Sequence, residues 1–358
     1  MKYIEEYRNK DLILKLSDHI KKSVTRNYSF MEVCGGHTSA IHRFGIPYLL
    51  PPEITLISGP GCPVCVTATD FIDKAIAYSK MENVTIVTFG DLIRVPGSGS
   101  SLEKEKTLGA DVRIVFSGLE ALKIARSEPD KQIIFLGIGF ETTAPGTAVT
   151  IITAKEEGLK NFLLLSAHKV MPPVMEAIVG QGIKIDGFVC PGHVAAITGS
   201  DIFKFLPVKY KLGCVIAGFE PTDILQSVLM LVRQINTGSP DIEIQYSRAV
   251  TTDGNLIAQD QLYKVFEHCD VNWRGFGNVT ASGLCLKAEY EDLDAGKRIP
   301  LKIKQYQDNP SCICGDILRG LRKPENCSLF RKKCTPENPV GACMVSAEGA
   351  CNTYFKYP

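Results

Sequence analysis

The chain has 358 residues, of which 45% are hydrophobic, and its 40 basic and 39 acidic side chains give a formal net charge of +1. This length predicts about two or three domains, and the hydrophobic content is typical of a globular protein with a substantial core. The balanced charge argues against nucleic acid or an anionic membrane as a partner.

The N-terminal region predicts a helix over residues 1–28, because its apolar residues keep helical spacing. It carries acidic residues and no apolar stretch, so it does not read as a signal peptide. No apolar run in the chain approaches the roughly 20 residues that span a bilayer. We therefore expect a cytoplasmic protein.

From about residue 29, short apolar runs that end near glycine alternate with helical patterns, which is typical of parallel α/β sheets. Eight runs are many for one compact sheet. We therefore predict two similar α/β domains, 29–130 and 131–250, and a third domain over 251–358 against which the segment 1–28 packs. The predicted strands are Ser29–Cys34, Ile54–Ser58, Thr85–Phe89, Val112–Phe116, Ile133–Ile138, Phe162–Leu165, Gly187–Cys190 and Cys214–Ala217, and the predicted helices include Asp70–Lys80, Gly118–Arg126, Thr147–Glu157 and Asp223–Ile235.

One sequence pattern occurs twice. The run Val33–Ile41 (VCGGHTSAI) resembles Val189–Ile197 (VCPGHVAAI), and a strand that ends in glycine follows each run about 25 residues later. The alternative is a chance similarity between strand–turn–helix units. We interpret the repeat as a duplication that produces two similar halves with a cleft between them.

Cys34 ends the first predicted strand, and the glycines after it open a helix. Ligands of open α/β sheets bind at the carboxyl ends of strands. The N–H groups of a helix start lower a thiol pKa, so we expect Cys34 to act as a thiolate nucleophile or a metal ligand. His37 would orient or protonate a bound group. The alternative is a small buried cysteine before a tight turn.

Cys62 and Cys65 form a C-x-x-C motif at another strand–helix junction, within the run GPGCPVC. This arrangement is typical of thiol–disulfide redox motifs, and Pro63 would stiffen the turn. Half of a zinc site is the alternative, but no second C-x-x-C exists to complete it.

Three more residues with acid–base potential follow predicted strands. Glu141 lies in the run GIGFETTAPG, where Thr142 stands in place of the third glycine of the dinucleotide fingerprint, so nucleotide binding is poorly supported. His168 and His193 occupy similar strand-end positions. One such histidine is usually structural, but several at one sheet edge together with Cys34 favour a site.

Six of the thirteen cysteines lie in the C-terminal tail. An odd number of cysteines cannot all form disulfides within one chain. Clustered cysteines in a cytosolic protein indicate metal or redox chemistry. Zinc sites usually show paired C-x₂₋₄-C knuckles, whereas four loosely spaced thiolates suit an iron–sulfur cluster. We predict a cluster, with zinc as the alternative and two cysteines left over. The six are Cys312, Cys314, Cys327, Cys334, Cys343 and Cys351.

These motifs together resemble the HypD family of hydrogenase maturation proteins over essentially the whole chain. The matching runs are Cys34–Thr38 (CGGHT), Gly59–Cys65 (GPGCPVC), Gly139–Thr143 (GFETT), Pro191–His193 (PGH), Trp273–Gly275 (WRG) and Cys334–Ser346 (CTPENPVGACMVS).

The resemblance implies a scaffold on which the Fe(CN)₂CO group of [NiFe]-hydrogenase is assembled, a role that is not that of a conventional enzyme. It implies two α/β domains and a third domain that holds a [4Fe–4S] cluster. The implied partners are a small HypC-type chaperone, which shares the iron, and a HypE-type carrier, which delivers cyanide as a thiocyanate. We expect the chain to be monomeric on its own.

The resemblance also implies residue roles. Cys34 matches the iron ligand, and Cys62 with Cys65 matches a thiol–disulfide pair near it. His37, Glu141 and His193 match positions that line the central cleft. The implied cluster ligands are Cys312, Cys327, Cys334 and Cys351, which leaves Cys314 and Cys343 as a second thiol pair.

Two other functions compete with the scaffold. A stand-alone iron–sulfur-linked thiol–disulfide oxidoreductase would reduce generic disulfides without a chaperone. A nucleotide-dependent enzyme would bind nucleotide tightly at a glycine loop.

Overall fold

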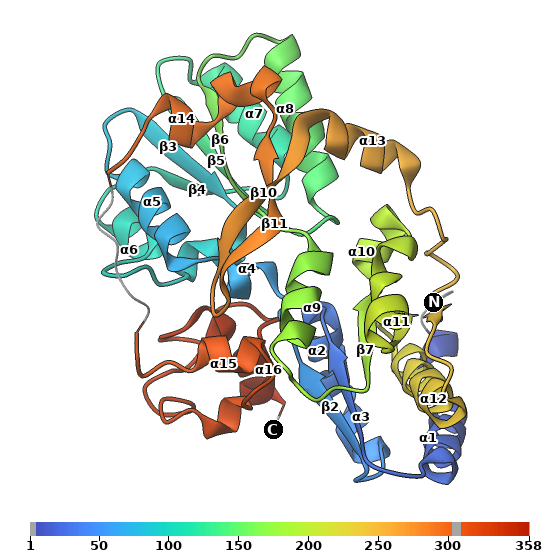
Figure 1. Ribbon diagram of the computed structural model, residues 1–358. Helices are drawn as coiled ribbons and strands as arrows, with labels where there is room; N and C mark the ends of the chain where they lie inside the picture. The colour runs from blue at the N-terminus through green and yellow to red at the C-terminus, as the bar shows by residue number, and fades with distance from the viewer. Residues whose placement is uncertain (1–4, 303–308, 358) are drawn as a thin grey trace.

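The computed structural model describes residues 5–302 and 309–357 (Figure 1). Their strands form a five-stranded parallel sheet, a four-stranded parallel sheet and a two-stranded antiparallel hairpin. The prediction of an α/β fold with parallel sheets and a cysteine-rich region is therefore confirmed. No helix in the described part of the chain has the length and apolar character needed to cross a membrane.

The five-stranded sheet has the order β2-β1-β7-β8-β9. Every neighbouring pair is parallel, so each connection crosses over the sheet. The strands are β1 (Tyr28–Glu32), β2 (Ile54–Ser58), β7 (Gly187–Pro191), β8 (Gly213–Ala217) and β9 (Ile242–Ile244).

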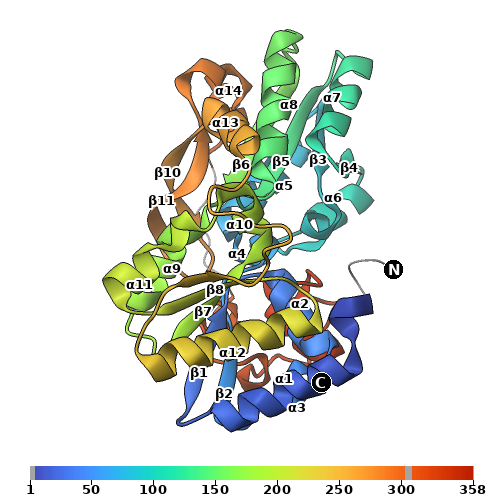
Figure 2. The same ribbon diagram turned by 90° about the vertical axis from the view of Figure 1, so that its right-hand side faces the viewer.

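The two faces of this sheet enter different hydrophobic cores. Phe30 and Val189 pack with α12 (Pro221–Thr237), whereas Met31 points to the opposite face, as the period of two along a strand requires. Helix α1 (Lys10–Ser23) packs on α12, and Figure 2 shows both helices on the same side of the sheet. The predicted packing of segment 1–28 with the C-terminal domain is thus wrong, because the apolar side of α1 is covered by α12.

The four-stranded sheet has the order β4-β3-β5-β6, and all neighbouring pairs are parallel. Helices α7 (Gly118–Ser127) and α8 (Ala144–Glu156) pack with one face. The other face shares a core with the five-stranded sheet and the cysteine-rich segment, so a continuous hydrophobic cluster joins all three. The strands are β3 (Val84–Thr88), β4 (Val112–Ile114), β5 (Gln132–Gly139) and β6 (Phe162–His168).

The remaining helices connect these strands or flank them. They are α2 (Gly35–Arg43), α3 (Ile46–Leu49), α4 (Pro63–Val66), α5 (Thr69–Ser79), α6 (Leu102–Thr107), α9 (Met171–Gly180), α10 (Gly192–Thr198) and α11 (Phe205–Tyr210), together with the 3-10 helices η1 (Glu5–Arg8), η2 (Gly90–Arg94) and η3 (Asp201–Phe203).

The predicted ranges 29–130 and 131–250 do not follow the two sheets. Strands β1 and β2 pair with β7 and β8, and the whole four-stranded sheet lies between them in the chain. The predicted boundary falls inside that sheet, since β3 pairs with β5. A series of alternating strands and helices does not say which strands become neighbours, because all buried parallel strands carry similar apolar runs.

The repeated pattern lies within one sheet. Val33–Ile41 follows β1, Val189–Ile197 begins in β7, and these two strands are hydrogen-bonded neighbours. The glycine-ended strands that follow, β2 and β8, flank them on either side. The repeat therefore does not produce one half for each sheet, and the interpretation as two halves is corrected.

The segment after residue 250 also divides differently from the prediction. Helix α13 packs on α8, and strand β11 packs on β6, so the part before residue 300 covers the four-stranded sheet. The hairpin lacks the long apolar runs that mark a buried strand, because many of its side chains are exposed. The elements here are α13 (Leu256–Val265), β10 (Phe266–Trp273), β11 (Gly277–Leu286), η4 (Ala288–Leu293) and α14 (Ala295–Arg298).

The cysteine-rich segment 309–357 forms a lobe of short helices and turns beside both sheets (Figure 1). Its helical elements are α15 (Cys314–Leu318), η5 (Pro324–Asn326), η6 (Ala342–Met344) and α16 (Ala350–Lys356). The stretch 303–308, which belongs to the predicted third domain, lies outside the described residues.

Candidate metal and thiol site

Cys34 is the residue that precedes α2, at the carboxyl end of β1. The backbone N–H groups of Gly36 and His37, at the start of α2, favour the thiolate, as predicted, although the Cys34 side chain makes no capping hydrogen bond. Burial acts more strongly in the opposite direction, and together with the carboxylate of Glu348 it raises the pKa of the Cys34 thiol to about 12. The expected low thiol pKa is therefore wrong for the protein without a cation at this site.

His37 is fully buried one helical turn after Cys34. Its Nε2 lies 3.0 Å from the carbonyl oxygen of Gly218 and 3.2 Å from that of Ala217. Carbonyl oxygens only accept hydrogen bonds, so Nε2 carries the proton and Nδ1 keeps a lone pair. No side chain or backbone group in the described residues bonds to Nδ1. Burial lowers the pKa of His37 to about 4, so its ring is neutral at pH 7.

Phe219 lies between the two histidines of the repeated pattern. Its ring stacks on His37 with centroids 4.5 Å apart and on His193 with centroids 3.9 Å apart. The three residues follow β1, β7 and β8, whose carboxyl ends meet at one edge of the sheet. Phe219 was missed by the sequence reasoning, although its position just after a predicted strand was a usable signal.

Two acidic side chains flank Cys34. Glu32 is buried, and its carboxylate accepts hydrogen bonds from the Cys34 backbone N–H and the Thr38 hydroxyl. Burial raises the pKa of Glu32 to about 8. Glu348 comes from the cysteine-rich lobe and packs against Gly35. A Cβ added to Gly35 would lie 2.6 Å from the Cβ of Glu348. Neither acid was a predicted site residue, and Glu348 carried no local signal.

The C-x-x-C segment lies directly against Cys34. Cys62 and Cys65 form a disulfide at the start of α4, with Cα atoms 5.2 Å apart and both side chains buried. The N–H of Gly35 donates to the Gly61 carbonyl over 2.9 Å. A Cβ on Gly61 would lie 2.2 Å from the Cys34 nitrogen, so only glycine permits this approach. The structure thus brings Cys34 and the C-x-x-C pair together.

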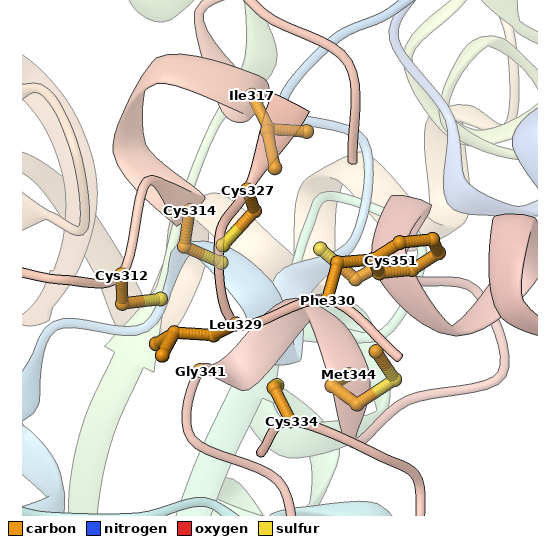
Figure 3. A pocket seen from close by; sticks show the side chains of 10 residues that line it. All are labelled: Cys312, Cys314, Ile317, Cys327, Leu329, Phe330, Cys334, Gly341, Met344 and Cys351. Carbon is orange, nitrogen blue, oxygen red and sulfur yellow. The ribbon is translucent and has the colours of Figure 1, made fainter. Parts of the chain in front are cut away.

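Five of the six tail cysteines line one pocket in the cysteine-rich lobe (Figure 3). The rest of the lining is apolar, with Ile317, Leu329, Phe330 and Met344. Soft thiolates in an apolar shell are the donors that an iron–sulfur cluster requires, so these residues fit such a group. The cysteines of the pocket are Cys312, Cys314, Cys327, Cys334 and Cys351.

Cys343 is buried beside this pocket and shares hydrogen bonds with Cys314 and Cys351. The carbonyl oxygen of its neighbour Ala342 lies 3.9 Å from the Cys65 sulfur. The lobe therefore reaches the C-x-x-C segment next to Cys343. Cys314 contacts Cys343 and also lines the pocket, so the structure does not separate four ligands from one spare pair.

Glu141 lies at the edge of the other sheet. One carboxylate oxygen accepts the Met171 N–H over 2.9 Å, and no described group bonds to the other oxygen. Burial raises the pKa of Glu141 to about 7. His168 is also buried, and its Nε2 lies 2.9 Å from the Thr147 hydroxyl oxygen. No hydrogen bond or ring contact within the described ranges joins Glu141 or His168 to the group around Cys34.

Four more cysteines form two pairs that the sequence reasoning did not assign. Cys190 and Cys214 are fully buried on neighbouring strands, with their sulfurs 2.8 Å apart. Cys269 and Cys285 form a disulfide that joins β10 to β11. Among residues 5–302 and 309–357, no three His, Cys, Asp or Glu side chains are arranged to hold a single metal ion.

Comparison with known proteins identifies relatives over nearly the whole chain. The family described as "HypD: Hydrogenase formation hypA family" matches residues 11–358. A hydrogenase maturation factor HypD of Rhizobium leguminosarum bv. viciae is 46% identical over 368 residues, covering 100% of this chain and 96% of that protein. The HypD of Cupriavidus necator is 44% identical and covers 100% and 97%. A putative hydrogenase expression/formation protein of Methanocaldococcus jannaschii is 44% identical and covers 97% and 95%.

Proposed function

The chain belongs to the HypD family and acts in hydrogenase maturation, and we propose that it holds iron at Cys34 while the Fe(CN)₂CO group of [NiFe]-hydrogenase is assembled. The observation that carries this proposal is the meeting of three thiol-bearing segments. Gly61 of the C-x-x-C segment contacts the Cys34 backbone, Glu348 of the cysteine-rich lobe packs beside it, and Cys65 reaches Ala342 of the same lobe.

The surroundings of Cys34 favour a cation over a proton. Burial and the neighbouring acids Glu348 and Glu32 disfavour a lone thiolate, whereas a bound Fe²⁺ would favour the ionised form of all three groups. His37 offers the lone pair of Nδ1 one turn away, fixed in orientation by two carbonyl groups.

Within residues 5–302 and 309–357, no three ligand side chains gather around one point to hold the iron. The proposal therefore includes a ligand from outside, the cysteine of a HypC-type chaperone.

The cysteine pocket fits a [4Fe–4S] cluster, which would supply electrons to the neighbouring thiols. Cys312, Cys327, Cys334 and Cys351 would hold it. Thiolate donors in an apolar pocket suit an iron–sulfur cluster, and the tail lacks the paired C-x₂₋₄-C knuckles that zinc sites usually use.

The pair Cys62/Cys65 would provide the two electrons that release cyanide. A thiocyanate on a HypE-type carrier, R–S–C≡N, reacts with the two thiols to give R–SH, HCN and the Cys62–Cys65 disulfide. The S–CN bond breaks, the S–S bond forms, and the two thiol protons go to the carrier sulfur and to cyanide. The Cys62–Cys65 disulfide would be the product of this step.

Vibrational spectroscopy tests the iron assignment. We would purify the complex with its HypC-type chaperone anaerobically and record the bands of iron-bound CN and CO. Cys34→Ala should remove these bands, whereas the matched control Cys190→Ala, a cysteine of the repeated pattern that faces the core, should retain them. A Cys34→Ala complex that keeps both ligand bands would refute iron binding at Cys34.

The thiol step has its own test. Cys62→Ser should abolish hydrogenase maturation, because a single remaining thiol cannot form the internal disulfide. Full maturation in Cys62→Ser cells would exclude this pair as the electron source.

A stand-alone oxidoreductase would act on generic disulfides without a chaperone. Cys62 is 3% exposed and Cys65 is fully buried, so any substrate, the carrier thiocyanate included, reaches the sulfurs only when the surroundings move; docking of the chaperone and carrier would provide that movement, and a generic disulfide would not. Rapid reduction of a model disulfide by the chain alone would favour that function instead.

A further inference from the structure

The tip of the hairpin β10–β11 carries the run Trp273–Gly275, which the proposed function leaves without a role. Arg274 lies against the segment that follows the C-x-x-C motif. Its backbone N–H donates to the Val66 carbonyl over 2.9 Å, and its Nε donates to the Thr67 carbonyl over 3.0 Å. Only 8% of Arg274 is exposed. A buried guanidinium is thus fixed two residues from Cys65.

The same tip also contacts the cysteine-rich lobe. Gly275 has a φ of +86°, and a Cβ there would lie 2.6 Å from the Cα of Gly315. Only glycine satisfies both conditions, so the two backbones touch directly. Gly315 immediately follows Cys314. Hydrogen bonding to Cys314 and burial raise the pKa of the Cys312 thiol, and the positive charge of Arg274 opposes that rise.

The four-stranded sheet holds the tip from a third side. Buried Lys169 donates from Nζ to the Asn272 carbonyl over 3.0 Å, and Nζ lies 5.0 Å from the centre of the Trp273 ring. The indole N–H of Trp273 donates to the Ser282 hydroxyl over 2.8 Å. The tip is therefore anchored, and Arg274 has a defined position between the C-x-x-C segment and the lobe.

We propose that Arg274 is a positioning residue that sets the redox equilibrium of the Cys62/Cys65 pair. It fixes the turn after Cys65 and holds a positively charged group against Thr67, two residues from Cys65. Reduction of the disulfide takes two electrons and places negative charge on sulfur once a thiol ionises, so a nearby cation favours the reduced form. Arginine side chains carry their charge in proteins, and salt screens a buried charge only weakly. The proposal rests on the thiol chemistry of the proposed function and names what tunes it.

The test measures the pair by itself. The anaerobic full-length chain is equilibrated in dithiothreitol redox buffers, its thiols are alkylated, and mass spectrometry gives the dithiol-to-disulfide ratio of the peptide that contains Cys62 and Cys65. In Arg274→Gln this ratio should fall about tenfold at a fixed buffer ratio, which corresponds to a more negative midpoint potential. Arg274→Lys should remain close to the wild type, because it keeps the charge.

Arg319→Gln is the matched control. Arg319 also contacts Gly315, with Nε 3.4 Å from its carbonyl oxygen, but its side chain is partly exposed and bonds to Gly315 and Asp316 rather than to the turn after Cys65. Its substitution should leave the ratio unchanged.

An unchanged ratio in folded Arg274→Gln would overturn the proposal, as would an equal fall in Arg274→Lys. If Arg274→Gln does not fold, Gly315→Ala replaces it. A Cβ on Gly315 would lie 2.9 Å from the Cα of Gly275 and would push the tip away while keeping the arginine. It should lower the ratio by a smaller amount, and a folded Gly315→Ala with the wild-type ratio would equally refute the role.

Failure of this inference is distinguishable from failure of the proposed function, because the ratio needs no iron, carrier or hydrogenase. Intact maturation in Cys62→Ser cells would refute the proposed thiol step but would not affect the inference about Arg274. Lost maturation in Cys62→Ser cells with an unchanged ratio in Arg274→Gln would end this inference alone.

Discussion

The two copies of the repeated pattern sit on neighbouring strands and yet differ in what they expose. Cys34 lies beyond the end of β1, at the start of α2, and the histidine of its pattern is buried with Nε2 bonded to backbone carbonyls. Cys190 lies inside β7, fully buried against Cys214, and the matching His193 is exposed. Strand β1 ends before Cys34, whereas β7 continues past Cys190. This difference in length places one cysteine at the sheet edge and the other in the core.

The largest expected effect distinguishes the two cysteines of the repeated pattern, Cys34 and Cys190. Cys34→Ser should reduce hydrogenase maturation at least about 100-fold, because a hydroxyl is a poor ligand for a soft metal site. Cys190→Ser should retain most maturation per folded molecule. Hydrogenase activity in extracts, normalised to the amount of the chain, measures both. Similar losses in the two variants would mean that the strand ends do not separate their roles.

The disulfide Cys269–Cys285 provides a cysteine pair that we expect to affect stability alone. It closes a loop with a sequence separation of 16 residues. A loop of that size stabilises a protein by about 3 kcal/mol in the chain-entropy account. Cys269→Ser should therefore lower the free energy of unfolding by about that amount under oxidising conditions. Denaturant unfolding with and without dithiothreitol checks this, and the variant should show no effect of the reductant at this pair.

The two histidines should differ in their response to acid. Burial lowers the pKa of His37 to about 4, below the value near 6.5 of an unfolded chain. The unfolded state then binds more protons between these values, so stability is full above about pH 6.5 and is lost as the pH falls. When the pH falls from 7 to 5, His37 should lower the free energy of unfolding by about 2 kcal/mol.

His37→Gln should therefore make the unfolding free energy less dependent on pH over that range, and His193→Gln should do so to a smaller extent, because burial also lowers the pKa of His193 but its side chain is more exposed. Urea unfolding at several pH values measures it. An unaltered slope in His37→Gln would show that the ring is not buried in its neutral form.

The smallest expected effect concerns the packing cysteines. Cys190→Ala removes a fully buried sulfur from the shared core and should lower stability by about 1 kcal/mol. Cys34→Ala removes a partly buried one and should cost less. Thermal unfolding of the two variants tests this order, which is the reverse of the order for maturation.

Much of the local structure was predictable. All eight predicted strands are present, because each is a short apolar run bounded by turn residues. The junctions that carry Cys34 and Cys62 were found for the same reason. The hairpin β10–β11 was missed, since its exposed face breaks the apolar pattern, and Arg274 at its tip was singled out only as part of the Trp273–Gly275 run.

Other members of the site could not be found locally. Glu348 is far from Cys34 in the sequence, meets it through packing, and has no local pattern that marks a site. Phe219 stacks on His37, and its position just after a predicted strand was its only signal. Glu32 is different, because its place two residues before Cys34 made it detectable.

The sequence by itself determined the strands, the turns at their carboxyl ends and the clustering of cysteines in the tail, because these depend on residues close together in the chain. Only the tertiary structure decided that β1 pairs with β7, that the four-stranded sheet is inserted between them, and that the tail closes on Cys34. The physical reason is that burial of apolar surface has no direction, and strands buried on both faces offer similar partners to one another. Which of them meet is settled by the packing of the whole core.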